Sequence, residues 1–244
     1  MAALLELEEV QREIARIRSE RTLPPAPAPR PPPEWRGGSG SAGVAEHVGR
    51  IQSFIESFEY NYSGKPFLSM KKSRGMAHIS SVSRQLLREA LPIQCVEAVF
   101  LGTYLTAGMS SLERIPLSFK TKFVRGTVHR HIVLAVRHAG KWGALGISRR
   151  STLMNKDIVF DTLADLVENY RASYEACYHK LLTVYIGLPF PHDLFVDHQI
   201  KWRATKIRVY GMESSSVRAQ INSFSSSCQD LAEYFRRQGT LPAE

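Results

Sequence analysis

The sequence predicts an α+β fold in which helices precede an antiparallel β-sheet. Apolar residues recur at helical spacing through residues 44–107, whereas residues 112–148 alternate or are rich in β-branched side chains. Ala139 and Gly140 supply a turn between two of these strands. The third observation is Cys95, which falls in the first turn of a predicted helix. The sequence therefore places a candidate thiol at a helix N-terminus beside a sheet.

The chain divides by composition into an N-terminal segment, 1–45, and a folded domain, 46–244. Residues 4–21 have the periodicity of a short amphipathic helix, which needs a partner surface to be stable. Residues 22–35 are rich in proline and predict a polyproline II spacer, followed by a Gly/Ser linker. Within the domain we expect an N-terminal helical part at 46–92, a central core at 93–205 and a C-terminal helical region at 206–244.

Composition excludes several classes of protein. No apolar run among the 244 residues approaches the roughly 18 needed to span a membrane, and the acidic N-terminus is not typical of a signal peptide. The three cysteines lack the paired spacing of a disulfide framework or a zinc site, which fits a reducing compartment.

The domain should open with three helices. The first covers residues 44–62, and a basic loop or short strand at 67–74 separates it from a second helix at 77–90. The third begins at Pro92, a residue suited to the first helical position, and stops near residue 107. Cys95 then lies where the helix dipole and unpaired N–H groups favour an anion, although free cysteines are usually core residues.

The predicted hairpin gives the thiol a possible base. Residues 128–137 form one strand and residues 142–148 the return strand. A two-residue loop pairs His138 with Lys141, and the same register then sets His131 opposite Ser148, with Cβ atoms roughly 5 Å apart. A histidine facing an oxygen acceptor is the arrangement a general base needs. His129 and His138 are rivals, and a loop of another length would break this register.

The remaining elements are less informative. Residues 161–183 predict one long helix and residues 184–196 a strand and loop. Residues 217–238 predict a helical region interrupted by serines at 223–227. Cys177 is expected to be a packing residue, and Cys228 has no assigned chemistry.

Positive charge is concentrated in the middle of the chain, whose total net charge is +9. Residues 60–156 hold 16 Lys or Arg against three Glu, a net +13. A field of this sign attracts an acidic partner, which could be nucleic acid or an acidic polypeptide.

Several motifs at consistent spacing resemble the vasohibin family over residues 46–205. They are Leu91–Val99, Leu112–Thr121, His131–Leu134 and Gly143–Arg150, with Tyr60–Asn61 upstream and Ile200–Trp202 downstream. The resemblance implies a transglutaminase-like, papain-like cysteine protease fold. It also implies a carboxypeptidase that removes the C-terminal tyrosine of α-tubulin, in the cytoplasm on the microtubule cytoskeleton, without a metal or cofactor.

The resemblance also implies roles for individual residues. Cys95 matches the nucleophile and His131 the general base. Ser148 matches the proposed third member, with the backbone carbonyl of Leu153 as the alternative orienting group. Tyr60 matches a tyrosine at the catalytic centre whose hydroxyl could donate to an oxyanion.

Substrate binding is implied by a second set of matches. Arg149 matches the arginine that holds the terminal carboxylate of the substrate, for which a guanidinium fork is suited. Gln94 stands where the family normally has a lysine that helps to bind the same carboxylate. Four basic residues match positions that bind the acidic tubulin tail: Lys71, Lys72, Arg74 and Lys120.

Two further departures concern partners. One residue is inserted between Phe123 and His131, and the region before residue 46 does not resemble the longer N-terminal part of vertebrate members. Because that part helps to clasp a small helical binding protein, dependence on such a protein stays open. We hypothesise that residues 4–21 cover part of the same apolar surface in cis.

Three alternatives remain at this point. A nucleic-acid-binding protein would need aromatic residues interleaved with the charges or a known module, and neither is evident, so nucleic acid is not expected as a partner, nor is a membrane. An inactive microtubule-binding scaffold could keep the acidic-tail site. A transglutaminase-type acyl transferase could use the same Cys–His pair.

Overall fold

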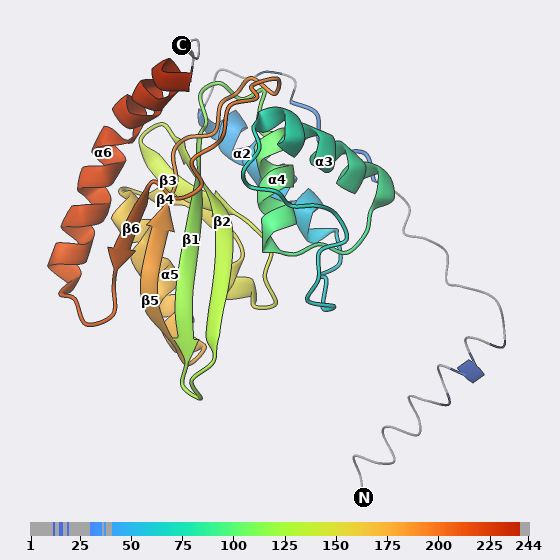
Figure 1. Ribbon diagram of the computed structural model, residues 1–244, viewed down its shortest axis with the longest axis horizontal. Coiled ribbons are helices and arrows are strands. Elements are labelled where there is room, and N and C mark those ends of the chain that lie inside the picture. Colours follow the sequence, from blue (N-terminus) through green and yellow to red (C-terminus); the bar gives the residue numbers. More distant parts are fainter. Residues whose placement is uncertain are drawn as a thin grey trace, which may run out of the picture.

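The computed structural model describes residues 12, 15, 16, 19, 30–35, 37 and 41–239. Figure 1 shows one antiparallel sheet with helices on both of its faces. The six strands lie in the order β4-β3-β2-β1-β5-β6. The predicted α+β class, with a helix N-terminus packed on an antiparallel sheet, is confirmed.

Helices α2, α3 and α4 precede strand β1 in the described chain, and α5 and α6 come later. The helices are α2 (Ser41–Glu56), α3 (Met76–Glu89), α4 (Cys95–Leu105), α5 (Leu163–Ala176) and α6 (Ser214–Gly239), with a 3-10 turn, η1 (Ser151–Leu153). The strands are β1 (Glu113–Phe123), β2 (Val128–His138), β3 (Lys141–Leu145), β4 (Lys156–Phe160), β5 (His179–Ile186) and β6 (Thr205–Arg208).

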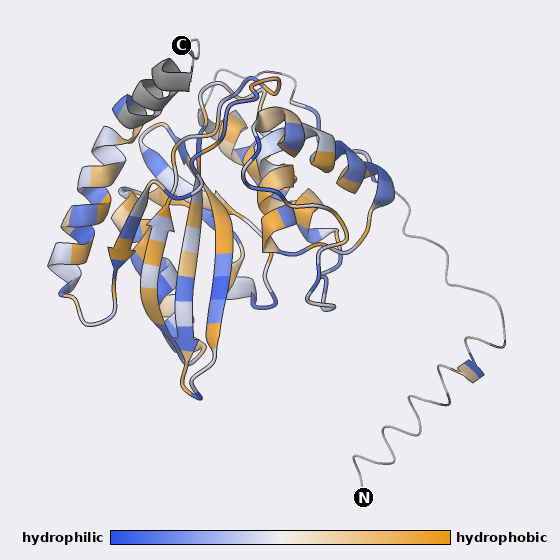
Figure 2. Ribbon diagram, in the orientation of Figure 1, coloured by the Kyte–Doolittle hydropathy of each residue, from blue (hydrophilic) through white to orange (hydrophobic). Residues whose placement is uncertain are grey.

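The sheet separates two hydrophobic clusters, because side chains alternate between its faces. On β2, Ile132, Leu134 and Val136 pack with α2, α3 and α4, whereas Val133 and Ala135 pack with α5 and α6. Figure 2 shows this alternation as bands along the central strands. The strand that carries His131 therefore lies between two cores, which hold its backbone in place.

The hairpin between β2 and β3 has the predicted turn. Ala139 and Gly140 have φ of 47° and 80°, the left-handed pair of a type I′ turn. His138 pairs with Lys141, and the predicted register continues to Leu134 opposite Leu145.

Beyond Leu145 the prediction is wrong, because β3 ends there and His131 has no partner on it. From α2, the buried Gln52 amide donates to the Gly146 carbonyl at 2.9 Å and accepts from its N–H at 3.0 Å. The Gln52 side chain thus makes the hydrogen bonds that a neighbouring strand would make to Gly146. The residues directly after Gly146 are not part of the sheet. The predicted cross-strand pair of His131 with Ser148 therefore does not form.

Other differences have local causes. The helix predicted at 161–183 ends at Ala176, and Tyr178, with φ of 61°, turns the chain into β5. Residues 217–238 belong to one continuous helix, α6, without an interruption at the serines. Strands β4 and β6 were not predicted, because both are short and their alternation is weak.

Helix α4 begins three residues later than predicted. Cys95 is its first residue, and Ile93 forms a parallel bridge with Tyr60 instead of continuing the helix. Pro92 is therefore outside the helix, while the prediction that Cys95 lies in the first turn is correct.

The N-terminal segment is only partly described. The helix predicted at 4–21 lies mostly outside the described residues, as does most of its proline-rich spacer. Trp35 packs against the cluster around α2, with its ring 4.9 Å from that of the buried His47. In the described part of the chain, no helix is both long and apolar enough to cross a membrane.

Candidate active site

The Cys95 thiol lies where helix α4 meets the open edge of β2. Strand β3 ends at Leu145, which pairs with Leu134. The residues of β2 that precede Leu134 therefore do not pair with β3, and this edge of β2 is open. The Ile132 N–H there donates a hydrogen bond to the Cys95 thiol. The thiol thus lies near the backbone of the residue that follows His131 in the sequence.

The His131 ring has a defined acceptor. Its Nε2 lies 2.8 Å from the Leu153 carbonyl oxygen. A carbonyl can only accept, so Nε2 carries the proton and Nδ1 keeps its lone pair in the neutral ring. This is the tautomer that a general base needs. The Ser148 hydroxyl instead accepts the Arg150 N–H at 3.3 Å, so the geometry favours Leu153 over Ser148 as the orienting group.

The turn that carries this carbonyl is held on both sides. Three consecutive carbonyls each accept from a side chain: Thr152 from Lys156 Nζ at 2.8 Å, Leu153 from His131, and Met154 from the Tyr170 hydroxyl at 2.6 Å. Tyr170 is fully buried in α5. The position of η1 is thus fixed by the core on the far side of the sheet.

Burial keeps the thiol and the imidazole neutral. It raises the pKa of Cys95 above the usual 9.0, an effect that Glu97 adds to and that the Ile132 N–H and Lys72 oppose. Burial also lowers the pKa of His131 to about 4, against a smaller opposing effect of the Leu153 carbonyl. Both shifts favour the uncharged forms, the thiol and the neutral imidazole.

Tyr60 is joined to the start of α4 through the backbone. Asn61 N–H donates to the Ile93 carbonyl and Ile93 N–H to the Glu59 carbonyl, both at 2.8 Å. Burial, and then proximity to Cys95, raises the pKa of the Tyr60 hydroxyl. The hydroxyl remains a proton donor at neutral pH and is available to an oxyanion near the thiol.

Both residues predicted to bind the substrate carboxylate lie near Tyr60. The exposed Arg149 guanidinium lies 6.0 Å from the centre of the Tyr60 ring. Gln94, the N-cap residue of α4, donates through Nε2 to the Asn61 carbonyl at 3.2 Å. The second amide hydrogen of Gln94 has no partner among the described residues.

The four basic residues predicted to bind an acidic tail differ in burial and in their place in the fold. Lys72 is half-buried, with Nζ 5.0 Å from the centre of the Trp202 ring, and acts electrostatically on Cys95. Lys71 and Arg74 lie exposed on the same loop. Lys120 is on β1 opposite Arg130, next to the position of His131. Of these four described residues, only Lys72 acts on the charge of the thiol.

Sequence reasoning missed three residues that shape the site. No sequence pattern indicates the roles of Gln52 and Lys156, because these roles depend on contacts that form only in the folded chain. Glu97 is 2% exposed and accepts from the N–H of Gln94, the cap residue three positions before it. That spacing is half of a capping box, and a helix start set at Cys95 would have revealed it.

The described residues contain no group of three or more His, Cys, Asp or Glu side chains placed to hold a metal ion. The chemistry that the arrangement can support is nucleophilic attack by a thiol, with a neutral imidazole as base and a phenol as oxyanion donor.

Comparison with known proteins gives two findings. Residues 3–229 match the vasohibin family. A relative, tubulinyl-Tyr carboxypeptidase 1 of Mus musculus, is 40% identical over 206 residues, which cover 84% of this chain and 54% of the relative. The chain thus spans about half the length of that protein. The family match begins at residue 3, so the expectation that residues before 46 lack a counterpart in the family is wrong.

Proposed function

The chain belongs to the vasohibin family, and we propose that it is a cysteine carboxypeptidase that removes the C-terminal tyrosine of α-tubulin. One observation carries the proposal. The Cys95 thiol is near the Ile132 N–H at the open edge of β2, and the preceding residue, His131, has its Nε2 bound to the Leu153 carbonyl. Similarity to a relative named as a tubulinyl-Tyr carboxypeptidase supports the substrate.

In the first step Cys95 Sγ attacks the carbonyl carbon of the peptide bond before the terminal tyrosine. The thiol proton passes to Nδ1 of His131, and the Leu153 carbonyl stabilises the imidazolium through Nε2–H. The Tyr60 hydroxyl donates to the oxyanion of the tetrahedral intermediate. His131 then returns the proton to the leaving amine, which frees tyrosine and leaves an acyl-enzyme.

In the second step water replaces the amine. His131 takes a proton from water, the resulting hydroxide attacks the thioester carbon, and the thiol is restored when the shortened chain leaves. A transglutaminase-type acyl transferase would differ only here, since an amine would take the place of water.

Selection of the chain end rests on charge. Arg149 and the free amide hydrogen of Gln94 bind the terminal carboxylate, which an internal peptide bond lacks. Lys71, Lys72, Arg74 and Lys120 bind acidic residues upstream of it. Because most of these side chains are solvated, substrate affinity should fall as salt concentration rises. We place the reaction on cytoplasmic microtubules, where this substrate is found.

The proposal is tested with microtubules and with a Glu-rich peptide that ends in tyrosine. The parent chain should release free tyrosine, and Cys95→Ala should release none while still binding the peptide. Both proteins are assayed alone and with the small helical vasohibin-binding protein, which decides whether that partner is needed. Release by Cys95→Ala at the parent rate would refute the nucleophile. Binding without release by the parent, with and without the partner, would identify a scaffold.

A further inference from the structure

Part of the sheet has a face that none of the described helices covers (Figure 1). Helices α2, α3 and α4 lie over one end of this face, while the ends of β1, β2, β5 and β6 in front of α5 remain open (Figure 1). Strand register places the residues of this face in cross-strand rows. One row runs from Arg130 through Lys120 and Thr183 to Arg208. We call this region the basic face.

Further cations lie on the rows to either side. Lys122 pairs with Lys180 in the row below, and Tyr185 pairs with Lys206 in the row above. The basic face therefore has six cations: Lys120, Lys122, Arg130, Lys180, Lys206 and Arg208. Five of these side chains are exposed, Lys120 being half-buried.

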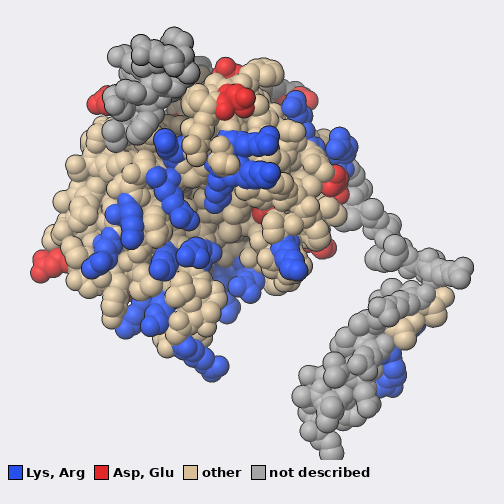
Figure 3. Space-filling model, viewed as in Figure 1, with Lys and Arg blue, Asp and Glu red and all other residues tan. Residues whose placement is uncertain are grey.

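No acidic side chain balances these charges locally. Residues 114–156, 176–192 and 198–212 contain neither Asp nor Glu. None of the six cations forms a salt bridge with a carboxylate in the described part of the chain. Figure 3 shows Lys and Arg gathered over these strands with hardly any Asp or Glu among them.

Like charges directly opposite each other destabilise a sheet. Arg130 opposite Lys120, and Lys122 opposite Lys180, are two such pairs. Charged residues that only keep a surface soluble do not need to lie opposite one another. A bound polyanion would reduce the repulsion within both pairs. The charge pattern therefore indicates a partner with regularly spaced negative charge.

The basic face is continuous with the candidate active site. Arg130 and Ile132 point to the same face of β2, and Ile132 is the residue whose N–H binds the Cys95 thiol. Residues two apart on one strand are about 7 Å apart. A polypeptide whose C-terminal end is bound at Cys95 would therefore reach the row that begins with Arg130 within about two residues.

We propose that the basic face, which shares Lys120 with the tail-binding residues, binds the acidic stretch of the substrate that continues upstream of them, as an extended polypeptide that crosses β1 and β5 toward β6. The inference rests on the proposed function. From β2 to β6 are three strand spacings, about 14 Å, a length that four to five extended residues span.

An acidic polypeptide fits this face better than a nucleic acid. Proteins that bind single strands offer bare aromatic rings on which bases stack. Here the Tyr185 ring already carries the Arg203 guanidinium at 4.7 Å, and the Tyr210 ring carries Lys180 Nζ at 5.4 Å. These tyrosines hold cations in position over the strands.

The test compares two labelled Glu-rich peptides that end in tyrosine, with about four and about twelve residues upstream of the cleaved bond. Binding is measured by fluorescence anisotropy at low salt on Cys95→Ala, which cannot consume the peptide. We expect the longer peptide to bind about tenfold more tightly. Adding Lys206→Glu and Arg208→Glu on the edge strand β6 should reduce this long-to-short ratio to about one.

The matched control adds Arg84→Glu and Arg88→Glu, exposed residues of α3 that change the net charge equally. It should keep the tenfold ratio. Equal binding of both peptides to Cys95→Ala, or an unchanged ratio in the β6 variant, would overturn the proposal. Loss of single-stranded RNA binding in the β6 variant, with the peptide ratio kept, would identify a nucleic acid partner instead. Since binding and tyrosine release are measured separately, failure of hydrolysis leaves this test decisive.

Discussion

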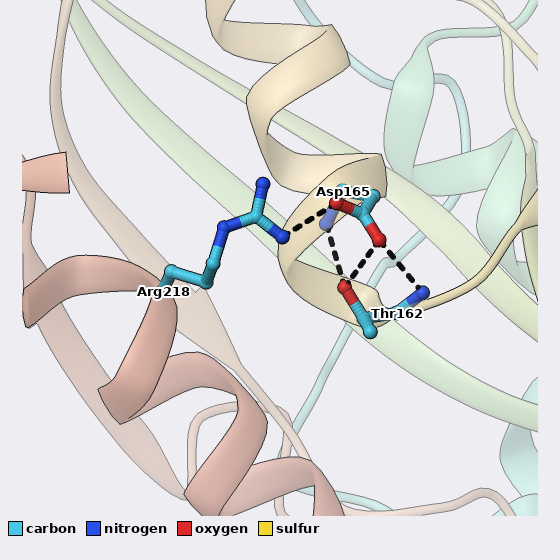
Figure 4. A network of polar contacts seen from close by, with 3 residues as sticks. All are labelled: Thr162, Asp165 and Arg218. Atoms are coloured by element: carbon cyan, nitrogen blue, oxygen red, sulfur yellow. Dashed lines mark hydrogen bonds and ion pairs between the residues drawn. The ribbon is translucent and has the colours of Figure 1, made fainter. Parts of the chain in front are cut away.

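Helices α4 and α5 pack on opposite faces of one sheet, and their N-termini are built in contrasting ways. At α5 the Thr162 hydroxyl accepts the Asp165 N–H at 3.1 Å, and the Asp165 carboxylate accepts the Thr162 N–H at 3.0 Å. Arg218 from α6 pairs with the same carboxylate (Figure 4). The Thr162 hydroxyl also donates to this carboxylate at 2.6 Å, and this bond first, then that of Arg218, lowers the pKa of Asp165. The terminus of α5 is closed by its own side chains.

At the N-terminus of α4 the side chain of the N-cap residue does not bind the helix. Gln94 makes no side-chain hydrogen bond to the helix and donates instead to the Asn61 carbonyl. The Glu97 side chain accepts two backbone N–H groups at this terminus, its own and that of Gln94.

The contrast separates two uses of the same physical feature. A closed capping box stabilises a helix, and α5 with its partner α6 needs that stability to hold η1 under His131. An open terminus forgoes some of this stability and keeps its dipole available to an anion. At α4 the anion would be the thiolate or the oxyanion formed during attack.

The largest expected effect is loss of the base beside the open terminus. His131→Gln can place its amide Nε2 near the position of the imidazole Nε2, as a donor to the Leu153 carbonyl, but removes the lone pair at Nδ1. We expect kcat/KM for tyrosine release to fall by about 10²–10⁴-fold, the usual contribution of general base catalysis. Thermal unfolding should stay close to that of the parent. Activity kept within a few-fold of the parent would mean that another group takes the thiol proton.

The next effect is on stability alone, at the closed terminus. Thr162→Ala removes the N-cap hydroxyl, and we expect the free energy of unfolding to fall by about 1 kcal/mol. Denaturant titration measures this change. Thr162→Ser keeps a hydroxyl and serves as the control. Because Thr162 lies outside the candidate site, kcat should not change, and a large drop in kcat would show that the two termini are coupled.

The fold was predictable where local signals agree with tertiary structure. Periodicity located α2, α3 and α4, and turn chemistry at Ala139 and Gly140 fixed five correct residue pairs. The helix–strand break at Tyr178 was missed, because apolar residues in 161–183 fit a helix until tertiary packing selects a strand. The short edge strands β4 and β6 carry too little pattern to be recognised alone.

The site was predictable as a set of residues but not as a geometry. Cys95 and His131 became candidates through their positions on a helix and a strand together with the family resemblance, and their roles stay predictions. The partner of His131 depended on whether β3 continued past Leu145, and that is decided by Gln52, which lies 94 residues away from Gly146 in sequence. No local pattern could report this contact, so Ser148 and Leu153 remained open alternatives.

A smaller effect sharpens the role of the cap residue at α4. Gln94→Lys restores the residue that the family normally has, and its charge should strengthen binding of the terminal carboxylate. We expect KM for a tyrosine-terminated peptide to fall by about two- to fivefold at low salt, with kcat unchanged. An amidated peptide, which lacks the carboxylate, is the control and should show no gain. An equal gain with that peptide would assign Gln94 to another contact.

The smallest expected effect is on the pKa of the Cys95 thiol, which is influenced by charged side chains near the N-terminus of α4. Glu97 raises the pKa of Cys95 and Lys72 lowers it. Glu97→Gln removes the negative charge while its amide oxygen can still accept the Gln94 N–H. The thiolate then forms more easily, so the midpoint of iodoacetamide alkylation should move to lower pH, by less than about one unit.

Lys72→Met should move the same midpoint to higher pH, because the thiolate loses a nearby cation. Both variants are measured in a Cys177→Ser background, since Cys177 is partly exposed and would react as well. Shifts in opposite directions would show that two side chains set the thiol pKa by their charges. A shift in the same direction for both would instead mean that the substitutions act by loosening the first turn of α4.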